Sequence, residues 1–418
     1  MYNVVDTFYG GLISSQALAA LSLSFPIYFI IIAFGYGTLQ GNTALIGNAL
    51  GRGQKEEAQQ YAIQGLLYGV ILGILLTVGG IAISPRVVEA MGATEPAYRQ
   101  MTLDYIVPIF YGSTFFIVNF MIQSILNAVG NTIPGRNIMI GGFLLNLALD
   151  PWFIYGGFGL PAMGIQGIAY ATVLVQLLSV VYLTSVVAKS ELVSWEAVRK
   201  YGLPDMRVFG RITEQGFPNT LDMMGVSLGF FVLNFFVGRF GQNAVAALGA
   251  ASRIEQIFLL PLLGFNVAAL SLAASNNGAK QYARVHEIFR SSVYYGSLVM
   301  LVTMTIAIIF ARPLMSIFSN DEQIIQIGVD FVRIRSIGLI PNAIFFMSSS
   351  TLRGLKKPIW PLIWNMVRFV GLPWLLIYIF VQQMGGNLTT IWITSTAAFF
   401  ITAGILWLIA RQMLPEIE

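Results

Sequence analysis

The chain has 418 residues, of which 56% are hydrophobic and only 10% are charged, whereas a soluble protein carries about 25% charged residues. Cysteine is absent and His286 is the only histidine, which excludes disulfides, a thiolate or histidine-rich metal site and a cysteine nucleophile. The net charge of +4 follows from the Lys and Arg residues of the loops and needs no nucleic-acid partner.

Apolar segments of about 20 residues recur along the whole chain, and each is long enough to cross a bilayer. They do not alternate apolar and polar residues as outer-membrane barrel strands do. We therefore predict an all-α, polytopic membrane protein with twelve transmembrane helices. The predicted spans are Val4–Ile13, Ala17–Ala49, Ala62–Ile83, Ile106–Leu126, Ile138–Tyr155, Ile165–Val187, Phe217–Val237, Ala244–Ala274, Val293–Ile309, Val329–Met347, Leu362–Phe380 and Ile391–Leu414. The first span is short and no cleavable signal pattern is present, so we expect a truncated first helix.

The charged loops predict the orientation in the membrane. Of the 23 Lys and Arg residues, fifteen fall in loops on one side and four on the other, which assigns the first side to the cytoplasm. We expect a multi-pass protein of the inner (plasma) membrane with a cytoplasmic C-terminus. The longest polar connection, Lys189–Arg211, lies on the same side. It predicts an N-terminal six-helix lobe (1–188), a cytoplasmic linker (189–206) and a C-terminal six-helix lobe (207–418).

The two halves of the chain resemble each other. Val4–Leu21 aligns without gaps with Phe231–Leu248, and the offset of 227 residues persists to Gly51 and Gly278, where both copies enter a charged loop. A shift of six spans preserves the orientation, so the halves are predicted to be parallel repeats. Transporters built from such repeats place their substrate site between the halves.

Two membrane-embedded acids distinguish the first half. Asp150 follows Asn146 by four residues, so both side chains lie on one face of a helix. Asp6 and Asp150 align with Leu233 and Leu372 of the second half. A carboxylate within hydrocarbon is costly and usually has a function. A purely structural pair would have no reason to occur in one half only, so we interpret both acids as functional.

Other polar residues are predicted to share a pocket with these acids. Asn119, Gln123 and Asn127 recur at a spacing of four on the fourth span, Thr172 lies on the sixth, and Tyr9 follows Asp6 by about one turn. The alternative is that the amides and hydroxyls only hydrogen-bond between helices, where each contributes about 0.5–1 kcal/mol.

The two acids suggest an exchangeable cation. A desolvated carboxylate holds its proton tightly and releases it when the pocket opens to water. The same carboxylates with Asn and Thr oxygens also suit Na⁺, so the sequence leaves H⁺ and Na⁺ open. We expect no cofactor besides this coupling ion.

The second half offers different residues. Arg253 and Glu255 are two positions apart on a predicted helix and cannot face each other, so each needs its own partner. Glu255 is a second candidate cation site, or it pairs with a basic residue such as Arg368. Met223 and Phe258 are candidate lining residues of an adaptable apolar substrate cavity, together with Tyr9 and Gln123. The alternative is that the Met and Phe side chains face lipid or core.

Several motifs together resemble one transporter family. VVDTFYGG, GNTALIGNALGRG, LLNLALDPWFIYGGFGLPAMGIQGIAYAT and ALGAASRIEQ resemble the multidrug and toxic compound extrusion (MATE) transporters, over essentially the whole chain. The resemblance implies twelve helices in two six-helix lobes. It also implies export of cationic, amphipathic compounds in exchange for H⁺ or Na⁺ by alternating access.

The resemblance also implies roles for individual residues. An acid in the first helix and the pattern N-x-x-x-D-P in the fifth are similar to the DinF-like branch, where the residues matching Asp6, Asn146 and Asp150 belong to an N-lobe cation site. Polar residues of the fourth and sixth helices surround that site; the best matches here are Asn119, Gln123 and Thr172. Glu255 matches the acid of a C-lobe cation site in other branches, but Ala343–Leu352 offers no second acid, which favours the N-lobe and protons.

We therefore expect a secondary antiporter and not an enzyme, because the sequence lacks a nucleophile, metal or phosphate-binding motif. Its expected partners are small cationic amphipathic molecules and membrane lipids, with no nucleic acid, and we expect a monomer. The alternatives are a flippase for lipid-linked oligosaccharides of the same superfamily, which needs a cationic cavity, and a channel.

Overall fold

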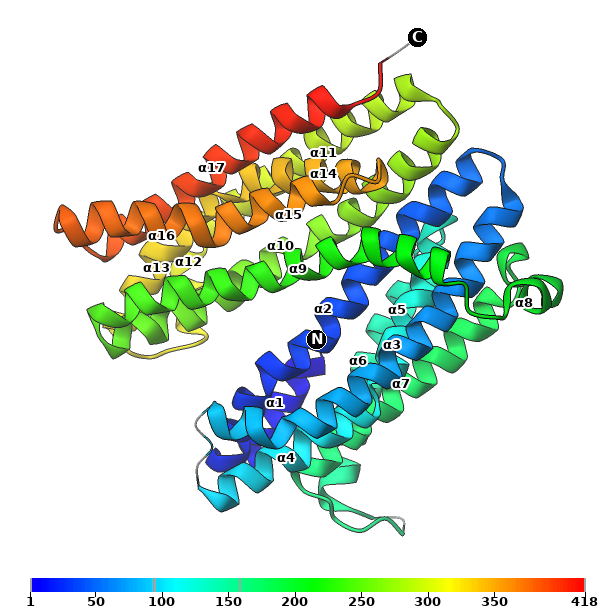
Figure 1. Cartoon of the computed structure of the whole chain (residues 1–418). Coiled ribbons are helices and arrows are strands. Elements are labelled where there is room, and N and C mark those ends of the chain that lie inside the picture. The colour runs from blue at the N-terminus through cyan, green and yellow to red at the C-terminus, as the bar shows by residue number, and fades with distance from the viewer. Residues whose placement is uncertain (1, 92, 94, 158, 417–418) are drawn as a thin grey trace. The chain divides into compact units, whose positions relative to one another are not determined.

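The computed structural model describes residues 2–91, 93, 95–157 and 159–416. These residues form helices joined by short loops (Figure 1), and the only strand-like pairing among them is one isolated bridge between Gly157 and Leu160. The prediction of an all-helical, polytopic chain is confirmed.

The helices of the first half are α1 (Tyr2–Ile13), α2 (Ser15–Gly51), α3 (Lys55–Ala90), α4 (Pro96–Tyr111), α5 (Ser113–Ala128), α6 (Ile133–Tyr155), α7 (Ile165–Val187), η1 (Glu191–Val193) and α8 (Trp195–Tyr201). Those of the second half are α9 (Met206–Val237), η2 (Gly238–Phe240), α10 (Gln242–Gly278), α11 (Tyr282–Ile309), α12 (Ala311–Ser316), α13 (Glu322–Ile337), α14 (Leu339–Gly354), α15 (Ile359–Met366), η3 (Val367–Gly371), α16 (Leu372–Ile377), η4 (Tyr378–Gln383) and α17 (Leu388–Met413).

Each predicted span coincides with one helix or with adjacent helices. Among the described residues, nine helices are long and apolar enough to cross a bilayer, and α4 with α5, bent by 44° at Gly112, makes a tenth. The remaining two are the short α1 and the pair α13 and α14, which is broken at Gly338. Hydropathy alone predicted unbroken helices at both breaks, because it averages over single glycines.

The described residues form two compact units. The first contains Met1–Ile46 and Gln54–Thr220, and the second contains Gly47–Gly53 and Leu221–Glu418. In the first unit, α3 packs against α4 and α5, α7 packs against α4, α5 and α6, and α1 lies against α6 and α7. In the second unit, α14 packs against α10, α11 and α17 and is buried along most of its length. Both units bury polar side chains on their inner helices, such as Asn146 in the first unit and Ser348 in the second.

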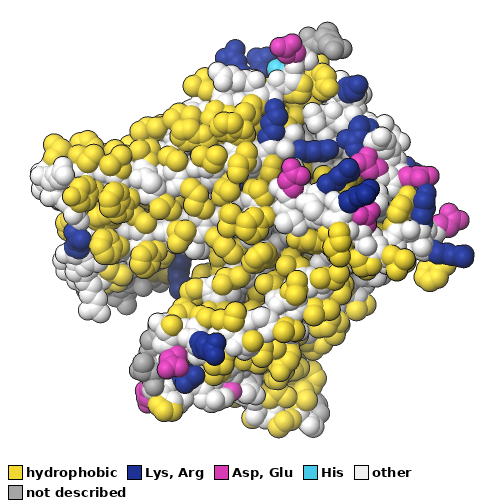
Figure 2. Space-filling view, viewed as in Figure 1, with side chains coloured by type: hydrophobic (Ala, Val, Ile, Leu, Met, Phe, Trp, Pro, Cys, Tyr) yellow, Lys and Arg dark blue, Asp and Glu magenta, His cyan; other side chains and the backbone are white. Residues whose placement is uncertain are grey.

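The surface of the molecule is strongly apolar. Figure 2 shows hydrophobic side chains along the exposed faces of the helices, while charged side chains gather near helix ends and around α8. Leu75, Val78 and Val181 are all at least 60% exposed. A continuous apolar surface of this kind suits contact with lipid.

The connection after α7 lies against the start of α3. Lys55 pairs with Glu191, and Lys200 pairs with Glu56 at 2.8 Å. The hydrogen bond from Lys55 holds the pKa of Glu191 below its usual range, and the bond to Glu56 raises the pKa of Lys200. All four side chains are exposed, so these pairs orient the connection and contribute little to stability.

The ends of α2 and α10 cross closely within the second unit. A Cβ atom at Gly278 would overlap the carbonyl oxygen of Asn48, and one at Gly51 would overlap that of Ser275. The two contacts are equivalent under the offset of 227 residues that relates the halves of the sequence. Asn277 also donates to Asn48 Oδ1 at 2.6 Å. Glycine is thus required here because the two backbones touch.

We expect Gly278→Ala to lower the free energy of unfolding by about 1–3 kcal/mol, because the added methyl group must push two backbones apart. The measurement is thermal or denaturant unfolding of the purified chain in detergent. Gly264→Ala in the same helix is the matched control, since a Cβ there meets nothing within 4 Å. Equal stability losses in the two variants would contradict the close crossing.

Candidate functional site

Asp6 lies at the centre of a buried polar cluster in the first unit. Its side chain is 2% exposed, although α1 is short, because α1 packs on α6 and α7. Tyr105 Oη donates to Asp6 Oδ2 at 2.9 Å, and Asn146 Nδ2 donates to Oδ1 at 3.0 Å. Thr172 Oγ1 lies 3.4 Å from Oδ1 and accepts from Asn146 Nδ2 at 3.3 Å. Three donors from three helices therefore surround one carboxylate.

Asp150 lies one turn after Asn146 on α6 and is fully buried. Its carboxylate is close enough to that of Asp6 for the two to interact electrostatically. Among the described residues, neither Asp150 oxygen has a hydrogen-bond partner, and Asn146 Oδ1 also has none. An ionised carboxylate without a donor is costly in such a place. Within the described chain, these three buried oxygens are therefore acceptors without a donor.

A proline fixes the position of α1 relative to this cluster. Pro151 lies inside α6 and has no N–H, so the carbonyl of Leu147, four residues earlier, loses its helical partner. Tyr9 Oη donates to this carbonyl at 3.0 Å. Tyr9 thus attaches α1 to α6 between Asn146 and Asp150. This attachment holds Asp6 beside Asn146, its hydrogen-bond donor on α6.

Asn119 and Gln123 belong to a neighbouring network. Gln123 Nε2 donates to Asn119 Oδ1 at 2.9 Å, and Asn119 Nδ2 donates to Gln176 Oε1 at 2.9 Å. The structure thus joins Asp6, Asn146 and Thr172 directly, whereas Asn119 and Gln123 bond to each other and to α7.

Sequence reasoning missed two members of these networks. Tyr105 donates to Asp6 but is one tyrosine among several in apolar spans, and nothing in its local sequence marked it. Gln176 follows Thr172 by four residues. That spacing places both side chains on one face of α7 and could have identified Gln176.

Glu255 pairs with a different arginine from the one suggested by sequence. Its Oε1 lies 3.0 Å from Arg335 Nη2, and the two side chains are 17% and 8% exposed. The expectation of Arg368 as a partner is wrong, because α10 packs against α13, which carries Arg335. A fixed guanidinium thus neutralises this carboxylate.

The two apolar lining candidates are half-buried. Phe258 on α10 lines a small cavity together with Glu255 and Arg335. Met223 on α9 is also half-buried.

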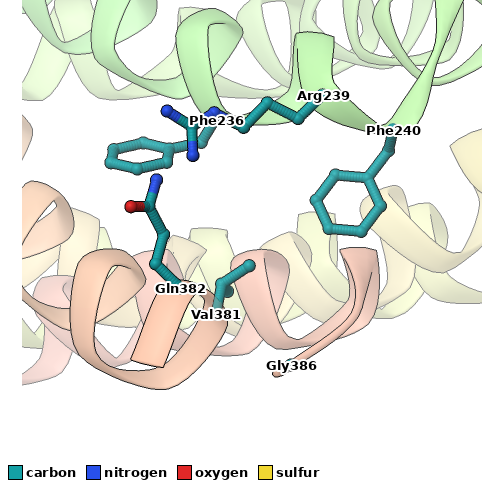
Figure 3. A pocket seen from close by; sticks show the side chains of 6 residues that line it. All are labelled: Phe236, Arg239, Phe240, Val381, Gln382 and Gly386. Atoms are coloured by element: carbon teal, nitrogen blue, oxygen red, sulfur yellow. The ribbon is translucent and has the colours of Figure 1, made fainter. Parts of the chain in front are cut away.

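A larger cavity of about 310 Å³ lies in the second unit, beside η2 and η4. Figure 3 shows Arg239 beside Phe236 and Gln382, with Phe240 and Val381 completing the wall. The Arg239 guanidinium lies 5.7 Å from the Phe236 ring centroid. A fixed positive charge in its wall disfavours a cationic ligand. The described residues also contain no group of three or more His, Asp or Glu suited to a metal ion.

The pairing of Glu255 with Arg335 predicts a specific pattern of stability. Glu255→Gln and Arg335→Met should each cost about 3–5 kcal/mol of unfolding free energy, because each leaves a buried charge alone. The double variant should recover most of the loss, as measured by unfolding in detergent. Strictly additive losses would contradict the pair.

Comparisons with known proteins agree with this architecture. A family model described as MatE matches residues 1–152 and 218–379. The probable multidrug resistance protein YoeA of Bacillus subtilis is 26% identical over 393 residues, covering 93% of this chain and 84% of that protein. An FAD transporter of Shewanella oneidensis is 27% identical, covering 88% of this chain and 81% of that protein.

Solved structures show the same fold. A crystal structure of MATE in the bent conformation matches with a TM-score of 0.91 at 24% identity, covering 99% of this chain and 91% of that chain. An outward-facing multidrug resistance MATE transporter matches with a TM-score of 0.90 at 24% identity and the same coverage. Because the family model covers well over half of the sequence and the fold agrees along nearly its whole length, the chain belongs to the MatE family of membrane transporters.

Proposed function

We propose that the chain is a secondary antiporter that exports cationic, amphipathic small molecules in exchange for H⁺. The observation that supports this most is the asymmetry of two buried carboxylates in one polar cluster. Asp6 accepts hydrogen bonds from three donors, whereas the described residues provide no donor to either oxygen of Asp150. A binding site of this kind is complete only when Asp150 carries a proton or faces a cation.

In this proposal the two acids have separate roles. Asp6 is the fixed negative charge, because Tyr105, Asn146 and Thr172 orient its oxygens. Asp150 is the exchanging group. When Asp150 loses its proton, the pocket becomes more negative and attracts a cationic substrate or a new proton. Because the export and return steps require opposite protonation states, proton flow and drug flow are coupled.

We propose H⁺ and not Na⁺ as the coupling ion for a geometric reason. Donors from Tyr105, Asn146 and Thr172 occupy the oxygens of Asp6, which are therefore not directed at a metal ion. Only the two oxygens of Asp150 and Oδ1 of Asn146 remain. In the second unit, Glu255 already has Arg335 as its cation, which leaves the first unit as the coupling site.

The helix bearing Asp150 also supplies a place for movement. Pro151 interrupts the backbone hydrogen bonds of α6 directly after Asp150, and Pro26 does the same within α2. We propose that bending at these prolines opens the pocket alternately to the two sides of the inner membrane. The protein works as a monomer in lipid with its C-terminus in the cytoplasm.

Several relatives are named for multidrug resistance, and one is named an FAD transporter. FAD is an anion, so transport of an anionic cargo, including a lipid-linked oligosaccharide, is the second candidate.

The test is ethidium efflux from everted vesicles with a proton gradient or a sodium gradient imposed alone. We expect protons to drive efflux. Asp6→Asn and Asp150→Asn should each reduce the rate roughly 10- to 100-fold, because the first removes the fixed negative charge and the second removes the exchanging carboxyl group. Asp104→Asn is the matched control, because this acid is partly exposed and accepts a hydrogen bond from Gln100 on its own helix.

Efflux driven by sodium alone would overturn the assignment of H⁺. Undiminished proton-driven efflux in Asp6→Asn would overturn the role of Asp6. Transport of an anionic probe in place of ethidium would favour the second candidate.

A further inference from the structure

The interior of the second unit contains an arginine that no acid neutralises. Arg368 is fully buried, and its Nη2 donates to Asn342 Oδ1. Its Nε and Nη1 have no hydrogen-bond partner among the described residues, which leaves three N–H donors without an acceptor. Within the part of the chain that the structure describes, Arg368 makes no ion pair with a carboxylate.

Three aromatic rings lie close to this guanidinium. Its carbon lies 4.0 Å from the Phe399 ring centroid, 4.3 Å from that of Phe345 and 5.2 Å from that of Phe369. Cation–π contacts of this kind stabilise the positive charge. They cannot accept the in-plane N–H groups, which need an oxygen.

The charges around Arg368 are already committed to other partners. The guanidinium carbon of Arg335 lies 4.1 Å from the centroid of the same Phe399 ring, and Arg335 is paired with Glu255. Arg353 is paired with Asp222. Among the described residues, this group therefore contains three arginines and two acids, an excess of one positive charge. An uncompensated buried charge is strongly destabilising, so a structural role for Arg368 would be better served by an apolar residue.

We propose that Arg368 is the centre of a binding site for an oxyanion, the carboxylate or phosphate group of a molecule that enters the second unit. A guanidinium with free in-plane donors binds such groups with short, charge-assisted hydrogen bonds. The aromatic rings of Phe345 and Phe399 accommodate an apolar portion of the same molecule. The site does not depend on proton coupling in the first unit, because no residue is shared between the two.

The helix that carries Arg368 is irregular at this point. Val367–Gly371 and Tyr378–Gln383 are both π-helical segments of one membrane span. Such segments are rare in α-helices and recur at functional sites. In this proposal, a local change of winding at these segments admits the anion to the buried side chain.

The test measures binding without any ion gradient. The full chain is purified into phosphatidylcholine nanodiscs, and its thermal unfolding midpoint is followed during titration with benzoate or inorganic phosphate. We expect a saturable rise, because a ligand that binds only the folded state stabilises it. Arg368→Met should lose the rise. Arg333→Met, at an exposed position on α13, should retain it.

Further measurements test whether the charge of the probe is required and whether the natural anion is a lipid or a soluble molecule. Benzamide has the ring of benzoate without its charge and should give no rise; a rise equal to that with benzoate overturns the proposal. Phosphatidylglycerol nanodiscs then replace the phosphatidylcholine nanodiscs. If this exchange raises the unfolding midpoint of the unmodified chain but not of Arg368→Met, and if benzoate or phosphate then causes no further rise, the anion is a lipid headgroup phosphate. If the probe effect persists, the anion is a soluble ligand.

Two controls keep the outcome decisive. Without probe, the unfolding midpoint of Arg368→Met should be no lower than that of the unmodified chain, because the substitution removes an unpaired charge. A large fall in this midpoint would contradict the absence of a partner for Arg368. If that variant does not fold, Arg368→Lys replaces it and should need a higher probe concentration. No saturable rise in the unmodified chain with either probe overturns the site.

Discussion

The cost of placing a charge in hydrocarbon constrains every part of this structure. Most buried charges are compensated: Glu255 has Arg335, and Asp6 has three hydrogen-bond donors. Among the described residues, Asp150 in the first unit and Arg368 in the second keep polar atoms without a hydrogen-bond partner. The described part of the chain offers Asp150 no donor and contains no ion pair between Arg368 and a carboxylate. Because an uncompensated buried charge is unfavourable in a folded protein, we propose that Asp150 exchanges an ion and that Arg368 binds an anionic ligand.

The cluster around Asp6 and Asp150 depends on the backbone as well as on its acids. Pro151 frees the carbonyl of Leu147, and Tyr9 uses that carbonyl to hold α1 in place. The same proline lies next to Asp150. A bend in α6 would therefore change both the surroundings of Asp150 and the attachment of the helix that carries Asp6. The interruption of α6 at Pro151 therefore links the surroundings of Asp150 to the position of Asp6.

Composition and residue spacing were enough to predict the spans and the core of the acidic cluster. Long apolar runs locate the spans, and the one-sided occurrence of Asp6 and Asp150 identifies the cluster that the structure assembles with Asn146. Contacts that depend on helix packing could not be predicted in this way. Tyr105 reaches Asp6 from another helix, and Arg335 reaches Glu255 because α13 lies beside α10. The lobe boundaries at 188 and 206, and the roles of the site residues, remain predictions.

Proton release on substrate binding tests the central claim most directly. Purified protein in weakly buffered detergent near neutral pH is mixed with ethidium, and the released protons are counted with a pH dye alongside the bound ethidium. We predict release from the unmodified chain and none from Asp150→Asn, because the exchanging carboxyl is gone. Ethidium binding without proton release in the unmodified chain, or equal release in Asp150→Asn, would contradict the claim.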